Sequence, residues 1–178
     1  KNNLSVIGID KNDSANNMCK YYKADICNWA ELDALQINDP VDCIIHLAAL
    51  TSPNTDRNLM YNVNVRGTEH ICRLGRKLKI RKIIYISTIS VYSSFNLKYI
   101  DELMPVNPVN YYGETKLAAE NIIQSSGINY TILRPTNIFG IPGDKYSNYF
   151  KKIQYRGKRF GIVFYYNRNT HLLYIYDL

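Results

Sequence analysis

Short apolar runs rich in β-branched residues alternate with helical patterns along this chain, and that alternation limits its fold more than any other feature. The runs that predict strands lie at 4–9, 41–47, 83–87 and 129–133. The segments that predict helices lie at 28–35, 56–79 and 108–127. Strands separated by helices form right-handed βαβ units, whose parallel sheet is covered by helices on both faces. The sequence therefore predicts an α/β fold with a doubly wound parallel sheet.

Local signals set the helix boundaries. Asn28 followed by Glu31 is a capping-box pattern that predicts a helix start. Pro108 can occupy the first turn of the last predicted helix, and Gly127 is a good residue to end it. The tail differs from the rest, because 160–166 and 171–176 are predicted to form a hairpin outside the main sheet.

The composition excludes several classes of protein. The net charge is +7, but the basic residues fall in two short runs, Arg73–Lys82 and Lys151–Arg159. The first suits the solvated end of a helix, where cations favour the helix dipole, so we expect an anionic small substrate and no nucleic acid. The longest apolar stretch, 43–50, is too short to span a membrane.

The cysteines and histidines predict neither disulfides nor a metal site. The four cysteines, Cys19, Cys27, Cys43 and Cys72, include no C-x-x-C pair, and the three histidines form no cluster with ligand spacing. This pattern is typical of a reduced, cytoplasmic protein. Cys43 lies inside an apolar run and is expected in the core.

Small, acidic or hydroxyl residues follow each predicted strand. Asp10, Ala48-Ala49, Thr88 and the run Pro135-Thr136-Asn137 all stand at strand ends. In open α/β sheets ligands bind at the carboxyl ends of the strands. The sequence therefore predicts one crevice, suited to a dinucleotide.

Asp10 is the candidate for recognising the nucleotide. A carboxylate at this strand end can accept both ribose hydroxyls of an adenosine and repel a 2′-phosphate, which favours NAD over NADP. The alternative is a turn aspartate, since Asp-Lys-Asn-Asp is turn-like by itself, and the adjacent Lys11 weakens the argument against a phosphate.

Tyr112 and Lys116 are the candidates for acid–base chemistry. Four residues apart on a helix, they share one face. We expect Tyr112 to be the general acid/base and Lys116 to lower its pKa, since a cation about 4 Å away supplies much of the required free energy. The alternative is a surface pair. Tyr111 lies next to Tyr112 but has Thr115, which carries no charge, four residues later.

Thr88 is expected to hydrogen-bond the reacting substrate oxygen. Ser87 and Ser90 compete for that role, and a threonine at a strand end is often only a local cap. Asn64 sits within a helical stretch, where an amide side chain is mildly unfavourable. It either faces solvent or points into the crevice.

Eight short segments in chain order resemble the extended short-chain dehydrogenase/reductase family, specifically its NAD-dependent epimerase/dehydratase group. They are Gly8-Ile9-Asp10, Ala24-Asp25-Ile26, His46-Leu47-Ala48-Ala49, Asn64-Val65-Arg66-Gly67-Thr68, Ser87-Thr88-Ile89-Ser90-Val91-Tyr92, Tyr112-Gly113-Glu114-Thr115-Lys116, Leu133-Arg134-Pro135-Thr136-Asn137-Ile138-Phe139-Gly140 and Ile175-Tyr176-Asp177. The resemblance implies a Rossmann-like fold that binds NAD and a nucleotide-sugar.

The resemblance also implies roles for individual residues. Asp25 and Ile26 would lie near the adenine, and Leu47, Ala48, Ala49 and Asn64 along the cofactor. Lys116 would hold the nicotinamide ribose, Pro135 and Thr136 would back the nicotinamide, and Asn137 would approach the diphosphate of the substrate.

The departures from the family pattern narrow the reaction. Dehydratases of the family carry acidic residues directly after the catalytic threonine, where this chain has Ile89 and Ser90. Epimerisation of a nucleotide-diphosphate sugar is therefore the favoured reaction and 4,6-dehydration is disfavoured. The alternatives are a ketoreductase or alcohol dehydrogenase of the same family, and a non-catalytic NAD-binding regulatory module.

The resemblance also sets the domain organisation. The glycine-rich loop and first strand of such a fold are expected upstream of Lys1, so residues 1–140 would form an incomplete NAD-binding domain with a gap in its sheet. Residues 141–178 would begin a small substrate-binding lobe. An isolated chain of this kind is expected to bind NAD poorly and fold badly. A homodimer through two long helices is the family expectation.

Overall fold

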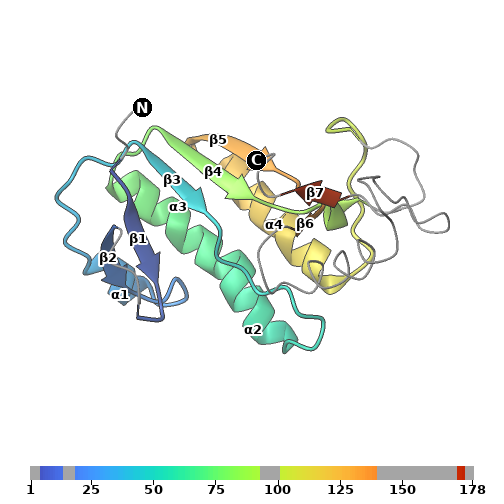
Figure 1. Cartoon of the computed structure of the whole chain (residues 1–178), viewed down its shortest axis with the longest axis horizontal. Helices are drawn as coiled ribbons and strands as arrows, with labels where there is room; N and C mark the ends of the chain where they lie inside the picture. Colours follow the sequence, from blue (N-terminus) through green and yellow to red (C-terminus); the bar gives the residue numbers. More distant parts are fainter. Residues whose placement is uncertain (1–4, 14–18, 93–100, 140–171, 175–178) are drawn as a thin grey trace, which may run out of the picture.

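The computed structural model describes residues 5–13, 19–92, 101–139 and 172–174. Strands and helices alternate through most of these ranges (Figure 1). In chain order the elements are β1 (Ile7–Asp10), β2 (Lys20–Lys23), α1 (Trp29–Asp33), β3 (Cys43–His46), α2 (Arg57–Tyr61), η1 (Asn62–Arg66), α3 (Gly67–Lys77), β4 (Lys82–Ile86), η2 (Ile89–Val91), α4 (Tyr111–Ser125), β5 (Asn129–Leu133), β6 (Asn137–Phe139) and β7 (Leu172–Tyr174). The α/β prediction is confirmed.

The strands form parallel sheets. β3, β4 and β5 make a three-stranded sheet in that order, with His46 opposite Tyr85 and Ile86 opposite Leu133. β1 and β2 pair in parallel as a separate sheet, so β1 and β3 are not hydrogen-bonded to each other. The predicted break in the sheet is present at this point.

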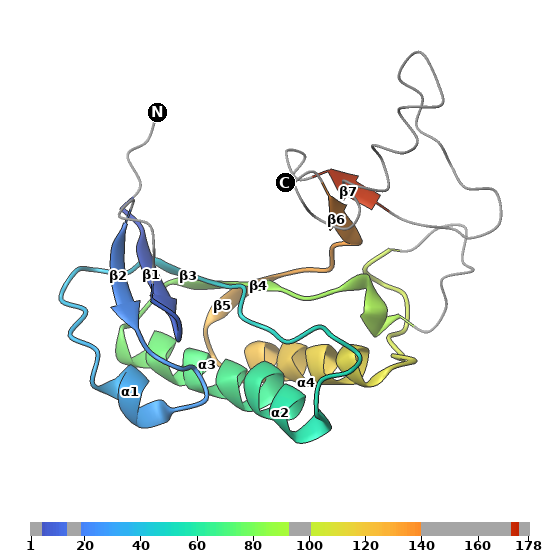
Figure 2. The same ribbon diagram turned by 60° about the horizontal axis from the view of Figure 1, so that its bottom comes forward.

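Helices α2, α3 and α4 lie on one face of the β3–β4–β5 sheet (Figure 2). The core on that face is built on Ile83 and Tyr85 of β4, packed against buried residues of α3 and α4. The strands β3, β4 and β5 lie in the sheet in the same order as in the chain. Right-handed connections between them therefore place α3 and α4 on the same side of the sheet.

The opposite face of this sheet is not covered among the described residues. Ile45 and Leu47 are 60% and 69% exposed, and Leu133 is 40% exposed. Cys43, at the start of β3, is exposed as well. The prediction that Cys43 is a core residue is therefore wrong, and the helices that the structure describes lie on the other face of this sheet.

The long helix predicted over 56–79 is present but interrupted. Asp56 caps it, its side chain accepting a hydrogen bond from the Leu59 N–H at 2.9 Å. Between α2 and α3 lies a π-helical turn, η1. Such turns are rare and often occur at functional sites, and periodicity alone does not reveal them.

Other boundaries follow from capping. Asn28 caps α1 as predicted, but Glu31 bonds the Asp25 N–H and the Asn28 side-chain amide instead of the Asn28 backbone. α4 begins at Tyr111 and not at Pro108, because the Asn110 side chain accepts from the Gly113 N–H at 2.8 Å. Gly127 follows this helix with φ of +75°, as a C-terminal glycine does.

The tail lies almost entirely outside the described residues, including the lobe expected over 141–178 and the first arm of the predicted hairpin. β7 is described, and it pairs in parallel with β6, Phe139 standing opposite Tyr174. Both strands lie outside the main sheet.

Candidate active site

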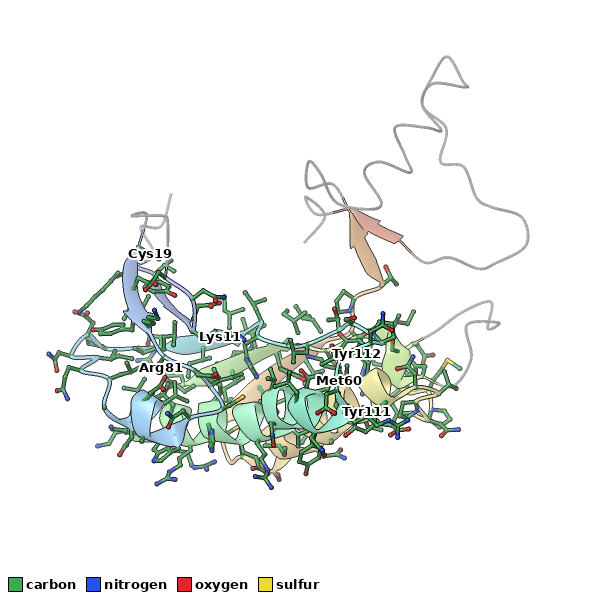
Figure 3. The ribbon with its side chains drawn as sticks, turned by 90° about the horizontal axis from the view of Figure 1, so that it is seen from below. Lys11, Cys19, Met60, Arg81, Tyr111 and Tyr112 are labelled. Atoms are coloured by element: carbon green, nitrogen blue, oxygen red, sulfur yellow. The ribbon has the colours of Figure 1, made fainter. Side chains whose placement is uncertain are left out.

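Helix α4 presents Tyr112 and Lys116 toward the end of β4. Figure 3 shows Tyr112 on the sheet side of α4 and Tyr111 on its outer side. Tyr111 donates a hydrogen bond to the Arg57 carbonyl at 3.3 Å and lies beneath the Arg57 guanidinium. Tyr111 therefore joins α4 to α2, and Tyr112 faces the predicted crevice.

Gly113 allows the first turn of α4 to approach the loop that follows β4. A Cβ atom at Gly113 would lie 2.3 Å from the Ser90 carbonyl oxygen and 2.9 Å from the Pro108 Cβ. Any other residue would force these backbones apart. The glycine therefore places Tyr112 beside Thr88.

Thr88 lies two residues after the end of β4 and caps the short helix η2. Its hydroxyl oxygen accepts from the Ser90 N–H at 3.1 Å, and the hydroxyl lies 3.2 Å from the Ser90 Oγ. Burial raises the pKa of Tyr112, and the nearby Thr88 hydroxyl offsets part of that rise. Thr88 thus combines the capping role with a position at Tyr112.

The competitor Ser87 points away from Tyr112. Its hydroxyl donates to the Glu120 carboxylate inside the core, and Ser87 is buried. Alternation along the strand end explains the difference, because successive side chains point to opposite sides.

Lys116 is buried, with only 2% of its surface exposed, and its ammonium group is hydrogen-bonded to the last residue of β4. The Nζ atom donates to the Ile86 carbonyl at 2.7 Å and lies 4.1 Å from the centre of the Tyr85 ring. Burial lowers the pKa of Lys116 to about 7, and Glu120 offsets part of that effect.

The expectation that Lys116 lowers the pKa of Tyr112 is therefore wrong for this structure. The pKa of Tyr112 is raised, and Thr88 is the group that opposes the rise. A lysine that loses its proton near pH 7 and bonds a strand carbonyl does not supply the full charge that the sequence argument assumed.

Asn64, in η1, is fully engaged within the protein. Its Oδ1 accepts from the Leu50 N–H at 2.8 Å, and its Nδ2 donates to the Leu50 carbonyl and to the Thr115 hydroxyl, both at 3.0 Å. Asn64 is 1% exposed. It does not face solvent, it ties the loop after β3 to α4, and its place along a cofactor stays a prediction.

That loop carries the predicted cofactor contacts of the third strand. Leu47 and Ala48 are exposed and Ala49 is half-buried. An exposed apolar surface at a strand end suits a flat organic ligand, and Asn64 holds it in register with the helix that carries Tyr112.

The end of β5 completes this group. The Pro135 carbonyl accepts from the Ile89 N–H at 3.0 Å, which places Pro135 and Thr136 beside the loop that follows Thr88. The Thr136 hydroxyl is buried and has no hydrogen-bond partner among the described residues. A buried hydroxyl of this kind fits a polar group of a bound cofactor. Asn137 is the first residue of β6, and its role stays a prediction.

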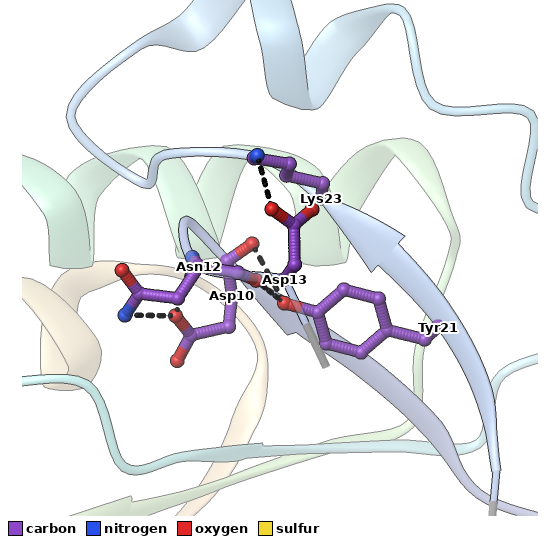
Figure 4. Close-up of polar contacts among 5 residues, drawn as sticks. All are labelled: Asp10, Asn12, Asp13, Tyr21 and Lys23. Carbon is purple, nitrogen blue, oxygen red and sulfur yellow. Dashed lines mark hydrogen bonds and ion pairs between the residues drawn. The ribbon is translucent and has the colours of Figure 1, made fainter. Parts of the chain in front are cut away.

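Asp10, Asp25 and Ile26 belong to the other sheet. Figure 4 shows Asp10 at the end of β1, where its Oδ1 accepts from the Asn12 N–H at 2.9 Å and from the Asn12 side-chain amide at 3.0 Å. The turn-aspartate alternative is thus present in the structure. The side chain is exposed and stays at the strand end that the sequence predicts.

Ile26 connects this sheet to the helices. Its carbonyl is 2.7 Å from the His70 Nδ1, and its side chain fills the space where a Cβ atom of Gly67 would stand. Asp25 accepts from the Cys27 N–H at 2.8 Å. The structure therefore places Thr88 near Tyr112, Lys116 against the end of β4, and Thr136 beside the loop that follows Thr88. Asp10 and Asp25 belong to the separate β1–β2 part of the chain.

Sequence reasoning missed a buried chain of polar groups beneath η1. The Thr68 hydroxyl donates to the Asn64 carbonyl at 2.7 Å, so its oxygen accepts from the His46 Nε2, 2.9 Å away. Burial, together with the Lys116 charge, lowers the pKa of His46 to about 3 and keeps it neutral. A histidine in an apolar run, followed 22 residues later by a threonine, gives no local signal of this pairing.

Within the described ranges, no group of three acidic, histidine or cysteine side chains could hold a metal ion. No helix there is long and apolar enough to cross a membrane. The four cysteines are free thiols.

Comparison with known proteins identifies the family. The model of the NAD dependent epimerase/dehydratase family matches residues 1–160 of the 178. The chain belongs to the NAD-dependent epimerase/dehydratase family. The match includes every candidate residue described above.

Individual members of the epimerase/dehydratase family are similar over part of their length. The human dTDP-D-glucose 4,6-dehydratase is 31% identical over 128 residues, which are 68% of this chain and 37% of that protein. The UDP-glucose 4-epimerase of Lactobacillus helveticus is 29% identical over 132 residues, 70% of this chain and 40% of that protein. The chain spans less than half the length of these two curated relatives.

Solved structures of similar proteins share the fold of this chain. The UDP-N-acetylglucosamine 4-epimerase from Bacillus cereus superposes with a TM-score of 0.70 at 26% identity, covering 87% of this chain and 55% of that one. Both an epimerase and a dehydratase are thus among the relatives, so the residues of the site must decide between the two reactions.

Proposed function

We propose that this chain forms the catalytic core of an NAD-dependent epimerase that acts on a nucleotide-diphosphate sugar. The observation that carries the proposal is the placement of Thr88, Tyr112 and Lys116 at the carboxyl ends of parallel strands, together with the buried Thr136 hydroxyl, which has no partner in the part of the chain that the structure describes. Family membership supports the use of NAD, and the epimerases among the relatives support the substrate class.

The residues would share the proton chemistry. The Tyr112 Oη takes the proton from a sugar hydroxyl, and the Thr88 Oγ1 donates a hydrogen bond to the same oxygen as negative charge develops there. NAD, when bound, supplies the centre that accepts and returns a hydride. When the keto sugar presents its other face, Tyr112 gives the proton back, and the configuration at that carbon is inverted.

The same geometry disfavours dehydration. Expelling water from the sugar requires a further acid and base, and the residues after Thr88 are Ile89 and Ser90. Ser90 is engaged with Thr88 in η2. Neither side chain can donate a strongly acidic proton.

Turnover by the full-length parent protein tests the proposal. It is incubated with UDP-glucose, UDP-N-acetylglucosamine or dTDP-glucose in D₂O, and the products are followed by NMR. We expect an epimer that carries no solvent deuterium at the inverted carbon, because the hydride returns within the site. We expect Tyr112→Phe to abolish turnover and keep NAD affinity.

The other outcomes identify the alternatives. A 4-keto-6-deoxy sugar would show a dehydratase, and stoichiometric consumption of NADH or NADPH would show a ketoreductase. NAD binding that leaves every nucleotide sugar unchanged, together with a Tyr112→Phe protein that keeps its biological role, would show a non-catalytic module. Each of these results contradicts the epimerase proposal.

Two details of the proposal are finer than the family shows. We propose that Asp10 selects NAD over NADP, which Asp10→Ser tests by comparing the affinities of the two cofactors.

We also propose a homodimer through α2, α3 and α4. Leu59 and Tyr61 of α2 are 51% and 42% exposed. Light scattering measures the mass of the parent protein.

A further inference from the structure

A buried ion pair joins α4 to the end of β5. The Glu120 Oε1 accepts from the Arg134 Nε at 3.0 Å, and its Oε2 accepts from the Arg134 Nη2 at 2.7 Å. Glu120 is 1% exposed and the Arg134 side chain 19%. This is the bidentate geometry in which a guanidinium and a carboxylate bind most strongly.

Two further groups extend this pair. The Ser87 hydroxyl donates to the Glu120 Oε1, and the Arg134 Nη1 donates to the Tyr92 hydroxyl at 2.7 Å. The Tyr92 hydroxyl in turn donates to the Asp101 carbonyl at 3.0 Å. The Glu120 carboxylate therefore lies at the centre of a network that is satisfied on all sides described.

Ser87, Glu120 and Arg134 are each next in sequence to a site residue or on the same helix face as one. Ser87 precedes Thr88, and Arg134 precedes Pro135 and Thr136. Glu120 lies one helical turn after Lys116 and two turns after Tyr112. Tyr92 follows η2, the turn that Thr88 caps.

The network does not touch the crevice side of these segments. Ser87 and Thr88 point to opposite sides of the same strand end, so the first bonds the core and the second faces Tyr112. A buried ion pair contributes little net stability, since well-packed apolar residues in its place are often as stable. Its position, and not its contribution to stability, is the informative feature.

We infer that Glu120, with Arg134 and Ser87, is a positioning group that fixes the spacing between Thr88, Tyr112 and Thr136 for proton transfer. The inference rests on the proposed function of that site. It predicts that loss of the network slows the chemical step while nucleotide-sugar and NAD still bind, because the three segments separate slightly and their outer surfaces stay intact.

The test uses full-length protein carrying Glu120→Gln or Ser87→Ala. Glu120→Gln keeps the shape of the side chain and removes the charge that holds Arg134. We expect kcat to fall by about tenfold or more, as small displacements of reacting groups do, with little change in KM. Ser87→Ala leaves the ion pair intact and is expected to lower kcat less. It keeps the inference testable if Glu120→Gln does not fold.

Two control variants separate positioning from general stability. Glu114→Gln removes an exposed carboxylate from the same helix, and Ile123→Val trims a fully buried core side chain on α4. Ile123→Val is expected to lower Tm and keep kcat. Glu120→Gln is expected to lower kcat even at temperatures far below its own Tm, where the variant is folded.

A second readout does not depend on turnover. Amide hydrogen exchange over 87–92 is expected to accelerate in Glu120→Gln and Ser87→Ala and to stay unchanged in Glu114→Gln. If wild-type protein turns over no sugar, the proposed function fails while the exchange result still stands. Unchanged kcat and unchanged exchange in Glu120→Gln, or an equal loss of kcat in Ile123→Val, would overturn the inference.

Discussion

At the scale of single residues, burial disfavours charge on the side chains in and around the candidate active site. Tyr112 has a raised pKa, Lys116 a lowered one and His46 is neutral, all through burial. Burial therefore disfavours the charged forms of all three side chains. A cofactor that brings positive charge to the site would complete the activation that Lys116 alone does not supply.

The lowered pKa of Lys116 predicts a pH dependence of stability. In the unfolded chain the lysine stays protonated up to its usual 10.5, whereas in the folded chain it loses its proton near 7. Above pH 7 the unfolded state binds more protons, so the free energy of unfolding rises with pH, by at most about 1.4 kcal/mol per unit.

Urea denaturation from pH 7 to 8.5 checks this prediction. That window avoids the Cys27 and Cys72 thiols, whose pKa values burial raises to about 11 and which act in the opposite direction at higher pH. The rise is expected across the whole window in the wild type, whereas Lys116→Met keeps only the small part near pH 7 that His46 contributes. Parallel pH profiles for the two proteins would contradict it.

Gly113 carries a second prediction at this scale. Gly113→Val places a branched side chain against the Ser90 carbonyl, where even a Cβ atom would stand 2.3 Å away. The helix must move from the Thr88 loop, and we expect a loss of about 1–3 kcal/mol in stability and of about tenfold or more in kcat. Glu114→Val, at the exposed next position, introduces the same residue without the clash and should behave like the wild type.

At the scale of elements, the π-helical turn η1 explains why an asparagine is tolerated inside a long helix. The turn places Asn64 between the loop after β3 and α4, where its amide replaces hydrogen bonds that the loop backbone cannot make otherwise. Thr68 satisfies the Asn64 carbonyl at the same point. The irregular helix is thus the element that aligns the third strand end with Tyr112.

Asn64→Leu tests that alignment. It preserves the size of the side chain but leaves the buried Leu50 backbone groups unpaired, which costs about 1–3 kcal/mol. We expect faster amide exchange at Leu50 and weaker NAD binding. Asn62→Leu, at an exposed position of the same turn, is the matched control. Equal exchange at Leu50 in both variants would show that Asn64 does not hold the loop.

Sequence predicted some of these elements and not others for identifiable reasons. β4 and β5 are β-branched runs, so local pattern was enough. β2 was missed because Lys20 and Lys23 end a strand of only four residues, which looks polar in sequence.

Among the site residues, motif and spacing were enough to find Tyr112, Lys116 and Thr88. Glu120 was missed because a glutamate four residues after a lysine looks like an exposed ion pair, whereas here it is buried and bonds Arg134.

At the scale of the whole molecule, two parallel sheets share one helix. No strand–strand hydrogen bond joins the β1–β2 sheet to the β3–β4–β5 sheet among the described residues. Leu74 of α3 packs with Ala24 and Leu32 on the side of the first sheet, while Ile123 of α4 lies in the core beneath the second. Side-chain packing on α3 therefore couples the β1–β2 sheet to the β3–β4–β5 sheet.

This arrangement predicts that the two sheets can be loosened separately. Leu74→Ala and Ile123→Ala each remove a fully buried aliphatic side chain and should each cost about 2–5 kcal/mol. Because packing and not backbone pairing joins the sheets, we expect Leu74→Ala to accelerate amide exchange mainly in β1, β2 and α1, and Ile123→Ala mainly in β4, β5 and α4. Both variants are measured in the full-length parent protein, with the wild type as reference. A uniform acceleration in either variant would instead show that the two sheets unfold as one cooperative unit, and that α3 transmits strain between Asp10 and Tyr112 without loss.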